Sequence, residues 1–154
     1  MLKRPTAVSF RRLSRDDMEE AAQVHRAAFD DRLPWLARLH TPEEDRAYFR
    51  NQVFAQGDVW GAIDGGLIGF IACRRGWIDQ FYVLPARQGQ GVGDALLTIA
   101  KDAFSELQLW TFQRNAPARR FYEKRGFTAL KESDGSRNEE REPDILYRWT
   151  RAAC

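Results

Sequence analysis

The sequence predicts one domain over residues 1–154 with a mixed α/β fold, in which seven strands form a sheet flanked by four helices. Three observations predict this class of fold. Short apolar runs typical of strands alternate along the chain with amphipathic stretches typical of helices. A glycine-containing turn at 64–66 joins two apolar runs as a hairpin. A glycine-rich segment at 88–93 leads from another apolar run into a helix.

The first part of the chain predicts one strand, at 7–13, followed by two helices. Ser14 and Asp17 have the spacing of a capping pair that begins the first helix. Its apolar stripe consists of Met18, Ala21, Ala22, His25, Ala28 and Phe29. The second helix begins after Thr41, with Pro42 at its first position and Glu44 as the reciprocal cap. We expect it to run to about Gln56, because Gly57 is a typical helix terminator.

The rest of the chain predicts six strands and two helices. The strands are expected at 59–63, 67–73, 77–83, 107–112, 127–132 and 144–150. A helix after the glycine segment has an apolar face made of Val92, Ala95, Leu96, Ile99 and Ala103. The last helix is expected at 116–125, where Gly126 ends it, and residues 133–143 form a polar loop. In the final strand, Ile145, Tyr147 and Trp149 share one face.

Composition and charge disfavour several classes of partner. A net charge of +2 is too small to indicate nucleic acid or a membrane surface as a partner. Trp77, Trp110 and Trp149 fall within strand patterns and are interpreted as packing residues. Cys73 and Cys154 form no C-x-x-C pair and lie near neither histidine, so we expect no metal site. No apolar run approaches the length of a membrane span, and we expect a cytoplasmic protein.

The glycine segment has the features of an anion-binding turn. Closely spaced glycines let backbone N–H groups converge, and the N-terminus of the next helix adds partial positive charge. Arg87, just before the turn, can add a charge-assisted contact to a phosphate oxygen. Two familiar phosphate motifs do not fit: Gly93 is followed by Asp94 and not by Lys, and the glycine spacing is not G-x-G-x-x-G. A tight turn without a ligand is the alternative interpretation of these residues alone.

Two segments of the chain resemble motifs of the GNAT acetyltransferase superfamily. The segment Gln88-Gly89-Gln90-Gly91-Val92-Gly93, preceded by Val83-Leu84-Pro85, is similar to the Q/R-x-x-G-x-G/A motif of that family. The segment from Asn115 through Phe121-Tyr122 to Gly126-Phe127 is similar to its N-x-x-A-x-x-F-Y-x-x-x-G-F segment. The element order also matches across nearly the whole chain. The resemblance implies a GNAT-like fold with a mixed, mostly antiparallel sheet.

The resemblance also implies acetyl-CoA as the cosubstrate. Its pyrophosphate would then be held by the backbone amides of Gln88, Gly89, Gln90, Gly91, Val92 and Gly93. Val83 would pair through its backbone with the pantetheine arm, which enters a gap between the fourth and fifth strands. Asn115 would hydrogen-bond the cosubstrate, and Tyr122 would lie near the thioester sulfur.

Acetyl transfer to an amine needs a proton donor for the departing thiolate and a route by which the amine loses its proton. Tyr122 suits the first role, since a phenol with a pKa of ~10 stays protonated at neutral pH; its alternative role is that of a core aromatic. For the base, our order of candidates is Asp79, then Glu139 or Glu140, then His40. Each has a plain alternative as a surface or loop residue, and bulk water can take the proton instead.

The sequence therefore favours an N-acetyltransferase that acts on a primary amine of a small molecule or a peptide N-terminus, by direct attack in a ternary complex. A non-catalytic acyl-CoA-binding module is the alternative, against which the intact Tyr122 and the nearby carboxylates argue. The acidic run at 138–144 would attract a cationic amine or merely keep a loop soluble. The acceptor itself stays open, as does a homodimer suggested by analogy with the family.

Overall fold

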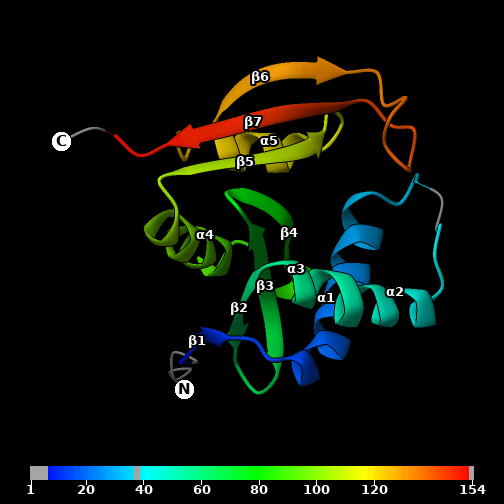
Figure 1. Ribbon diagram of the computed structural model, residues 1–154, viewed down its shortest axis with the longest axis vertical. Helices are drawn as coiled ribbons and strands as arrows, with labels where there is room; N and C mark the ends of the chain where they lie inside the picture. Colours follow the sequence, from blue (N-terminus) through cyan, green and yellow to red (C-terminus); the bar gives the residue numbers. More distant parts are fainter. Residues whose placement is uncertain (1–6, 37–38, 153–154) are drawn as a thin grey trace, which may run out of the picture.

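Seven strands form one sheet in the order β1-β2-β3-β4-β5-β7-β6 in the computed structural model, which describes residues 7–36 and 39–152 (Figure 1). The strands are β1 Ser9–Arg12, β2 Asp58–Ile63, β3 Leu67–Arg74, β4 Trp77–Val83, β5 Glu106–Phe112, β6 Thr128–Ser133 and β7 Asp144–Thr150. Every pair of neighbours is antiparallel except β4 and β5, which are parallel. The predicted fold class, a mixed and mostly antiparallel sheet, is confirmed.

Four helical segments accompany the sheet, as predicted. They contain α1 Met18–Arg32, α2 Pro42–Tyr48, α3 Phe54–Gln56, α4 Val92–Ala103 and α5 Ala116–Glu123. A π-helical turn, Phe49–Val53, joins α2 directly to α3, so that 42–56 is one helical segment that stops before Gly57. The predicted cap at its start is present, because Glu44 N–H donates to the Thr41 hydroxyl (3.1 Å) and the Glu44 carboxylate accepts from Thr41 N–H (3.0 Å).

Two hydrophobic clusters pack on the sheet. One brings α4 and α5 together with β5 and β7 through residues such as Leu96, Tyr122 and Tyr147. The other joins α1 and the 42–56 segment to β2 and β3 through residues such as Met18, Phe49 and Phe70. Strand β3 contributes to both, and all of its residues except Arg74 are buried. Such double burial is typical of a central strand with helices on both sides.

The predicted apolar face of α4 is partly wrong. The structure buries Val92, Leu96, Leu97 and Ala100, whereas Ala103 is exposed. The face is rotated relative to the prediction because α4 packs against β2 and β3, and Leu97 takes a core position there. No helix in the described part of the chain is long and apolar enough to cross a membrane.

His25 lies on α1 in an aromatic environment. Its ring meets Tyr82 edge to face, with 4.7 Å between centroids, and lies 5.5 Å from the Phe49 ring and 5.7 Å from the Phe29 ring. Its Nδ1 is buried and has no hydrogen-bond partner among the described residues. Burial lowers the pKa of His25 from 6.5 to about 4, because the charged imidazolium is poorly solvated there. His25 is therefore a neutral packing residue at neutral pH.

We expect the free energy of unfolding to fall as the pH falls from about 6.5 towards 4, by up to about 1.4 kcal/mol per pH unit, because the unfolded chain binds the His25 proton more readily. The measurement is denaturant unfolding across this pH range of two proteins, one with His25 and one with the substitution His25→Phe. His40 has a raised pKa, mainly through its hydrogen bond to Glu139, and contributes a slope of the opposite sign at pH values near and above 6.5. Both proteins should therefore carry His40→Gln. Equal pH slopes in the two proteins would contradict the assignment.

Candidate functional site

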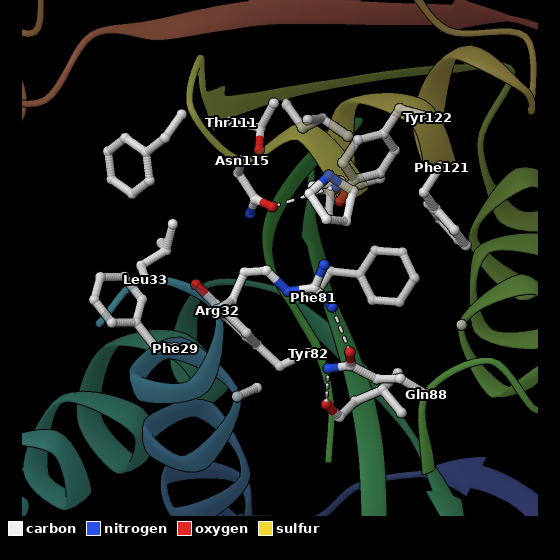
Figure 2. A pocket seen from close by; sticks show the side chains of 18 of the residues that line it. Phe29, Arg32, Leu33, Phe81, Tyr82, Gln88, Thr111, Asn115, Phe121 and Tyr122 are labelled. Atoms are coloured by element: carbon white, nitrogen blue, oxygen red, sulfur yellow. Dashed lines mark hydrogen bonds between the residues drawn. The ribbon is translucent and has the colours of Figure 1, made fainter. Parts of the chain in front are cut away.

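The site is organised by the way in which β4 and β5 separate. The two parallel strands share one paired position, Trp77 with Gln108, and the Gln108 N–H donates to the Gly76 carbonyl (2.8 Å). No other β4–β5 pair occurs in the described chain, so the strands diverge towards Val83 and Phe112. A cavity of about 380 Å³ lies between them (Figure 2). The end of α1, the glycine turn and α5 complete its wall.

The glycine turn forms one end of this cavity. Gly89 and Gly91 have φ values of 76° and 85°, a region that favours glycine. A Cβ built on either residue would meet nothing within 4 Å, so backbone conformation and not crowding within the protein requires glycine there. Gly91 is the N-cap of α4 and provides no side-chain cap. The amides of the first α4 turn thus lack intrahelical acceptors, an arrangement that is suited to binding an anion.

The predicted cofactor-binding residues divide into two groups. Six line the cavity: Val83, Gln88, Gly89, Gly91, Gly93 and Asn115. The side chains of three others point elsewhere. Val92 is buried in the core, and Gln90 accepts a hydrogen bond from Arg87 Nε (3.0 Å). The Arg87 guanidinium forms an ion pair with Asp64 in the β2–β3 hairpin (2.8 Å), so its charge already has a partner within the described chain.

Gln88 connects three parts of the site. Its Nε2 donates to the Val83 carbonyl at the end of β4 (2.9 Å), and its Oε1 accepts from Arg32 Nη2 at the end of α1 (Figure 2). The hydrogen bond from Leu84 N–H to the Ile68 carbonyl (2.8 Å) holds the end of β4 against β3. The entrance to the glycine turn is therefore tied to both the sheet and α1.

Tyr122 and Asn115 reach the cavity from the α5 side (Figure 2). The Tyr122 side chain packs between the rings of Phe121 and Phe127, with centroids 5.4 Å and 5.3 Å away. Its hydroxyl forms no hydrogen bond to any described residue, and burial raises the pKa of the phenol well above its ordinary value. Asn115 is the N-cap of α5, since its Oδ1 accepts from Ala118 N–H (3.3 Å). Asn115 thus has a structural role in addition to any contact with a ligand.

Asp79 is the one predicted base that lines the cavity within the described chain. It lies at a β-bulge, because Ala72 and Cys73 of β3 pair with Gln80 and Ile78 and leave Asp79 without a partner. Its carboxylate accepts from Arg74 Nε (3.0 Å). The bulge turns a residue of a central strand outward, where it meets both the cavity and solvent.

Glu139, Glu140 and His40 do not line the cavity. Glu139 and His40 contact each other, with 2.6 Å between Oε1 and Nε2, and so link the loop before α2 to the loop before β7. This hydrogen bond is the main reason that the pKa of His40 is raised. Glu140 is partly buried, and the loss of solvent raises the pKa of its carboxyl. In this arrangement a base role for any of the three would require a substrate that extends to these loops.

Several residues of the cavity wall carry no sequence signal that would place them at the site. Phe29, Arg32 and Leu33 come from the end of α1, and Leu109, Trp110, Thr111 and Phe112 come from β5. Tyr82 also lines the cavity, and burial raises the pKa of its phenol. None of these residues belongs to a motif; they reach the site through the packing of α1 against β4 and through the divergence of β5. No group of three or more potential metal ligands occurs in the described chain.

Comparisons with known proteins identify the type of domain. The family model described as an acetyltransferase (GNAT) domain matches residues 55–129, which include the glycine turn, Asp79, Asn115 and Tyr122. The peptidyl-lysine N-acetyltransferase YiaC of Escherichia coli is 35% identical over 82 residues, which are 53% of this chain and 53% of that protein. The match to this curated relative thus covers only about half of its length.

Solved structures show the same fold over nearly the whole chain. The solution structure of apo YjaB from Escherichia coli has a TM-score of 0.77 at 22% identity, covering 95% of this chain and 99% of the other. The PaiA N-acetyltransferase of Thermoplasma acidophilum, solved in complex with coenzyme A, has a TM-score of 0.70 at 21% identity, with 94% and 99% covered. At these identities the likeness establishes the fold.

Proposed function

Because this chain belongs to the GNAT acetyltransferase superfamily, we propose that it transfers an acetyl group from acetyl-CoA to a primary amine of a small molecule or of a peptide, by direct attack in a ternary complex. One observation carries the proposal: β4 and β5 diverge above a glycine turn whose amides are free to bind an anion. The cavity between the strands also contains a buried phenol and a carboxylate.

The residues present fit acetyl-CoA. The open space at Gly89 and Gly91 can receive phosphate oxygens close to the backbone, and the start of α4 adds partial positive charge. The extended pantetheine arm would lie along the free edge of β4, next to Val83. The Val83 carbonyl faces this edge, since it accepts its hydrogen bond from the Gln88 side chain. Acetyl-CoA, when bound, supplies the thioester that the amine attacks.

We propose Tyr122 as the proton donor for the departing thiolate. Its hydroxyl has no hydrogen-bond partner among the described residues, so it is available to a ligand. Burial keeps the phenol protonated at neutral pH, because the phenolate would be poorly solvated in its apolar surroundings. A hydroxyl that stays neutral can donate a hydrogen bond to developing negative charge on sulfur and then deliver its proton.

We propose Asp79 as the residue that takes the proton of the amine, directly or through water. The carboxylate lines the cavity, and Arg74 fixes its position through a hydrogen bond of 3.0 Å. Glu139 is the weaker candidate, since its carboxylate already contacts His40 outside the cavity. The proposed base, Asp79, lies on β4, and the proposed proton donor, Tyr122, lies on α5. Both residues line the same cavity.

The experiment that tests the proposed function is thiol release from acetyl-CoA across a panel of acceptors. The panel contains small amines, peptides with a free N-terminus, and lysine peptides, the last because the relative YiaC is named a peptidyl-lysine N-acetyltransferase. Release that depends on one acceptor class supports the enzyme and names its substrate class. Bound acetyl-CoA without release for any acceptor would instead indicate the non-catalytic binding module.

We expect Tyr122→Phe to lower kcat by about 10²- to 10⁴-fold, because the variant lacks the proton donor but keeps the ring packing. The affinity for acetyl-CoA, measured by calorimetry, should stay nearly unchanged. Asp79→Asn should also lower the rate, but for a different reason, because it removes the proposed base. Its loss of rate should become smaller as the pH rises, since an amine that is already deprotonated needs no base. Unchanged turnover in Tyr122→Phe would remove this residue from the mechanism.

Gly91→Val should weaken acetyl-CoA binding by at least about tenfold, because the side chain fills the space over the turn and a β-branched residue resists the φ of 85°. Gly65→Val is the matched control. Gly65 has a φ of 72° and equally open surroundings, but it lies in the β2–β3 hairpin. Both variants should lose similar stability, while calorimetry detects weaker binding only for Gly91→Val. Equal affinities in the two variants would refute the placement of the pyrophosphate.

A further inference from the structure

Two of the cations near the glycine turn are already neutralised by carboxylates. Arg87 pairs with Asp64, and Arg125 pairs with Asp94 in the first turn of α4, each at 2.8 Å. Arg125 also lies over the Phe121 ring, 3.8 Å from its centroid, which fixes the guanidinium on α5. The turn itself therefore offers a pyrophosphate only partial charges from its backbone amides.

Arg32 differs from these two arginines. It is the last residue of α1, lines the cavity, and donates through Nη2 to the neutral amide oxygen of Gln88. Within the described residues, no carboxylate forms an ion pair with it. A guanidinium has five N–H donors in a planar fork, and one amide oxygen satisfies only part of that capacity. Arg32 is partly buried and, among the described residues, bonds to a neutral oxygen only, so a bound anion would give its charge a partner.

We propose that Arg32 binds the pyrophosphate of acetyl-CoA, an inference that rests on the proposed function. The guanidinium contacts the side chain of Gln88, the first residue of the glycine turn, and Gln88 in turn contacts the last residue of β4. It therefore lies near the junction of the two stretches where the phosphates and the pantetheine arm would bind. Figure 2 shows the Arg32 side chain extending from α1 to Gln88.

The proposed contact also gives α1 a role in cosubstrate binding. A phosphate oxygen would replace or join Gln88 Oε1 as the partner of Arg32, in a charge-assisted hydrogen bond stronger than the present one. Phe29 and Leu33, which flank Arg32 on the cavity wall, would then cover apolar parts of the arm. Arg32 could instead bind a carboxylate of the acceptor. The experiment below distinguishes that anion from the pyrophosphate of acetyl-CoA.

The experiment measures the affinity of the wild type and of Arg32→Gln for three ligands. Acetyl-CoA and dephospho-CoA both contain the pyrophosphate, whereas S-acetylpantetheine contains no phosphate; calorimetry serves the first two, and NMR titration the weaker third. We expect Arg32→Gln to bind the first two about 10- to 100-fold more weakly and S-acetylpantetheine about equally well. Arg32→Lys, which keeps the charge but not the fork, should give an intermediate loss for the first two.

Arg50→Gln is the matched control, because Arg50 is exposed, lies in the π-helical turn and is absent from the cavity wall. It removes the same charge and should leave all three affinities unchanged. The inference would be overturned if Arg32→Gln lost as much affinity for S-acetylpantetheine as for acetyl-CoA. It would also be overturned if Arg32→Gln bound acetyl-CoA as tightly as the wild type but had a higher KM for acceptors that contain a carboxylate. If the wild type failed to bind acetyl-CoA at all, the proposed function would fall together with the inference. Wild-type binding that Arg32→Gln does not alter would overturn the inference alone.

Discussion

The site depends on a parallel strand pair that is joined at only one position. Trp77 and Gln108 hold the N-terminal ends of β4 and β5 together, and antiparallel partners hold the other edge of each strand. The C-terminal ends can therefore separate without loss of the sheet. Separation leaves backbone groups of β4 and β5 that face an open cavity, and such groups need partners from a ligand or from water. A gap of this kind favours an extended ligand with amide groups of its own.

Polar side chains also connect the elements around the gap to one another. Gln88 joins the end of β4 to α1, while Arg125 joins α5 to the start of α4 through Asp94. The Arg114 guanidinium lies 4.3 Å from the centroid of the Trp35 ring and so links the loop after β5 to the loop after α1. Contacts of this kind are exposed or partly exposed and individually weak. They allow the walls to adjust when a ligand enters, whereas the two hydrophobic clusters keep the sheet fixed.

Local sequence signals located most of the elements and the centre of the site. The bounds of β4 and β7 agree with the prediction, because prolines and clear apolar patterns mark their ends. The lining roles of Gly91 and Tyr122 could be anticipated from motifs in which each residue type has a conformational or chemical reason. Arg32 could not, since nothing within α1 indicates that its last residue meets Gln88, 56 positions away. The partners of Arg87 and Glu139 were missed for the same reason: each ion pair is set by tertiary packing and not by local pattern.

The environments of Tyr122 and Asp79 differ in the way that the proposed reaction requires. Tyr122 is 8% exposed and its raised pKa keeps the proton in place until negative charge develops beside it. Asp79 is exposed at its bulge and also borders a second, smaller hollow lined by Tyr48 and Arg74. A proton taken from an amine must leave for solvent in every cycle, which favours an exposed acceptor, whereas a donor that must stay protonated at neutral pH favours burial. The fold thus separates the two residues proposed for proton transfer by solvent access, and both line the cavity between β4 and β5.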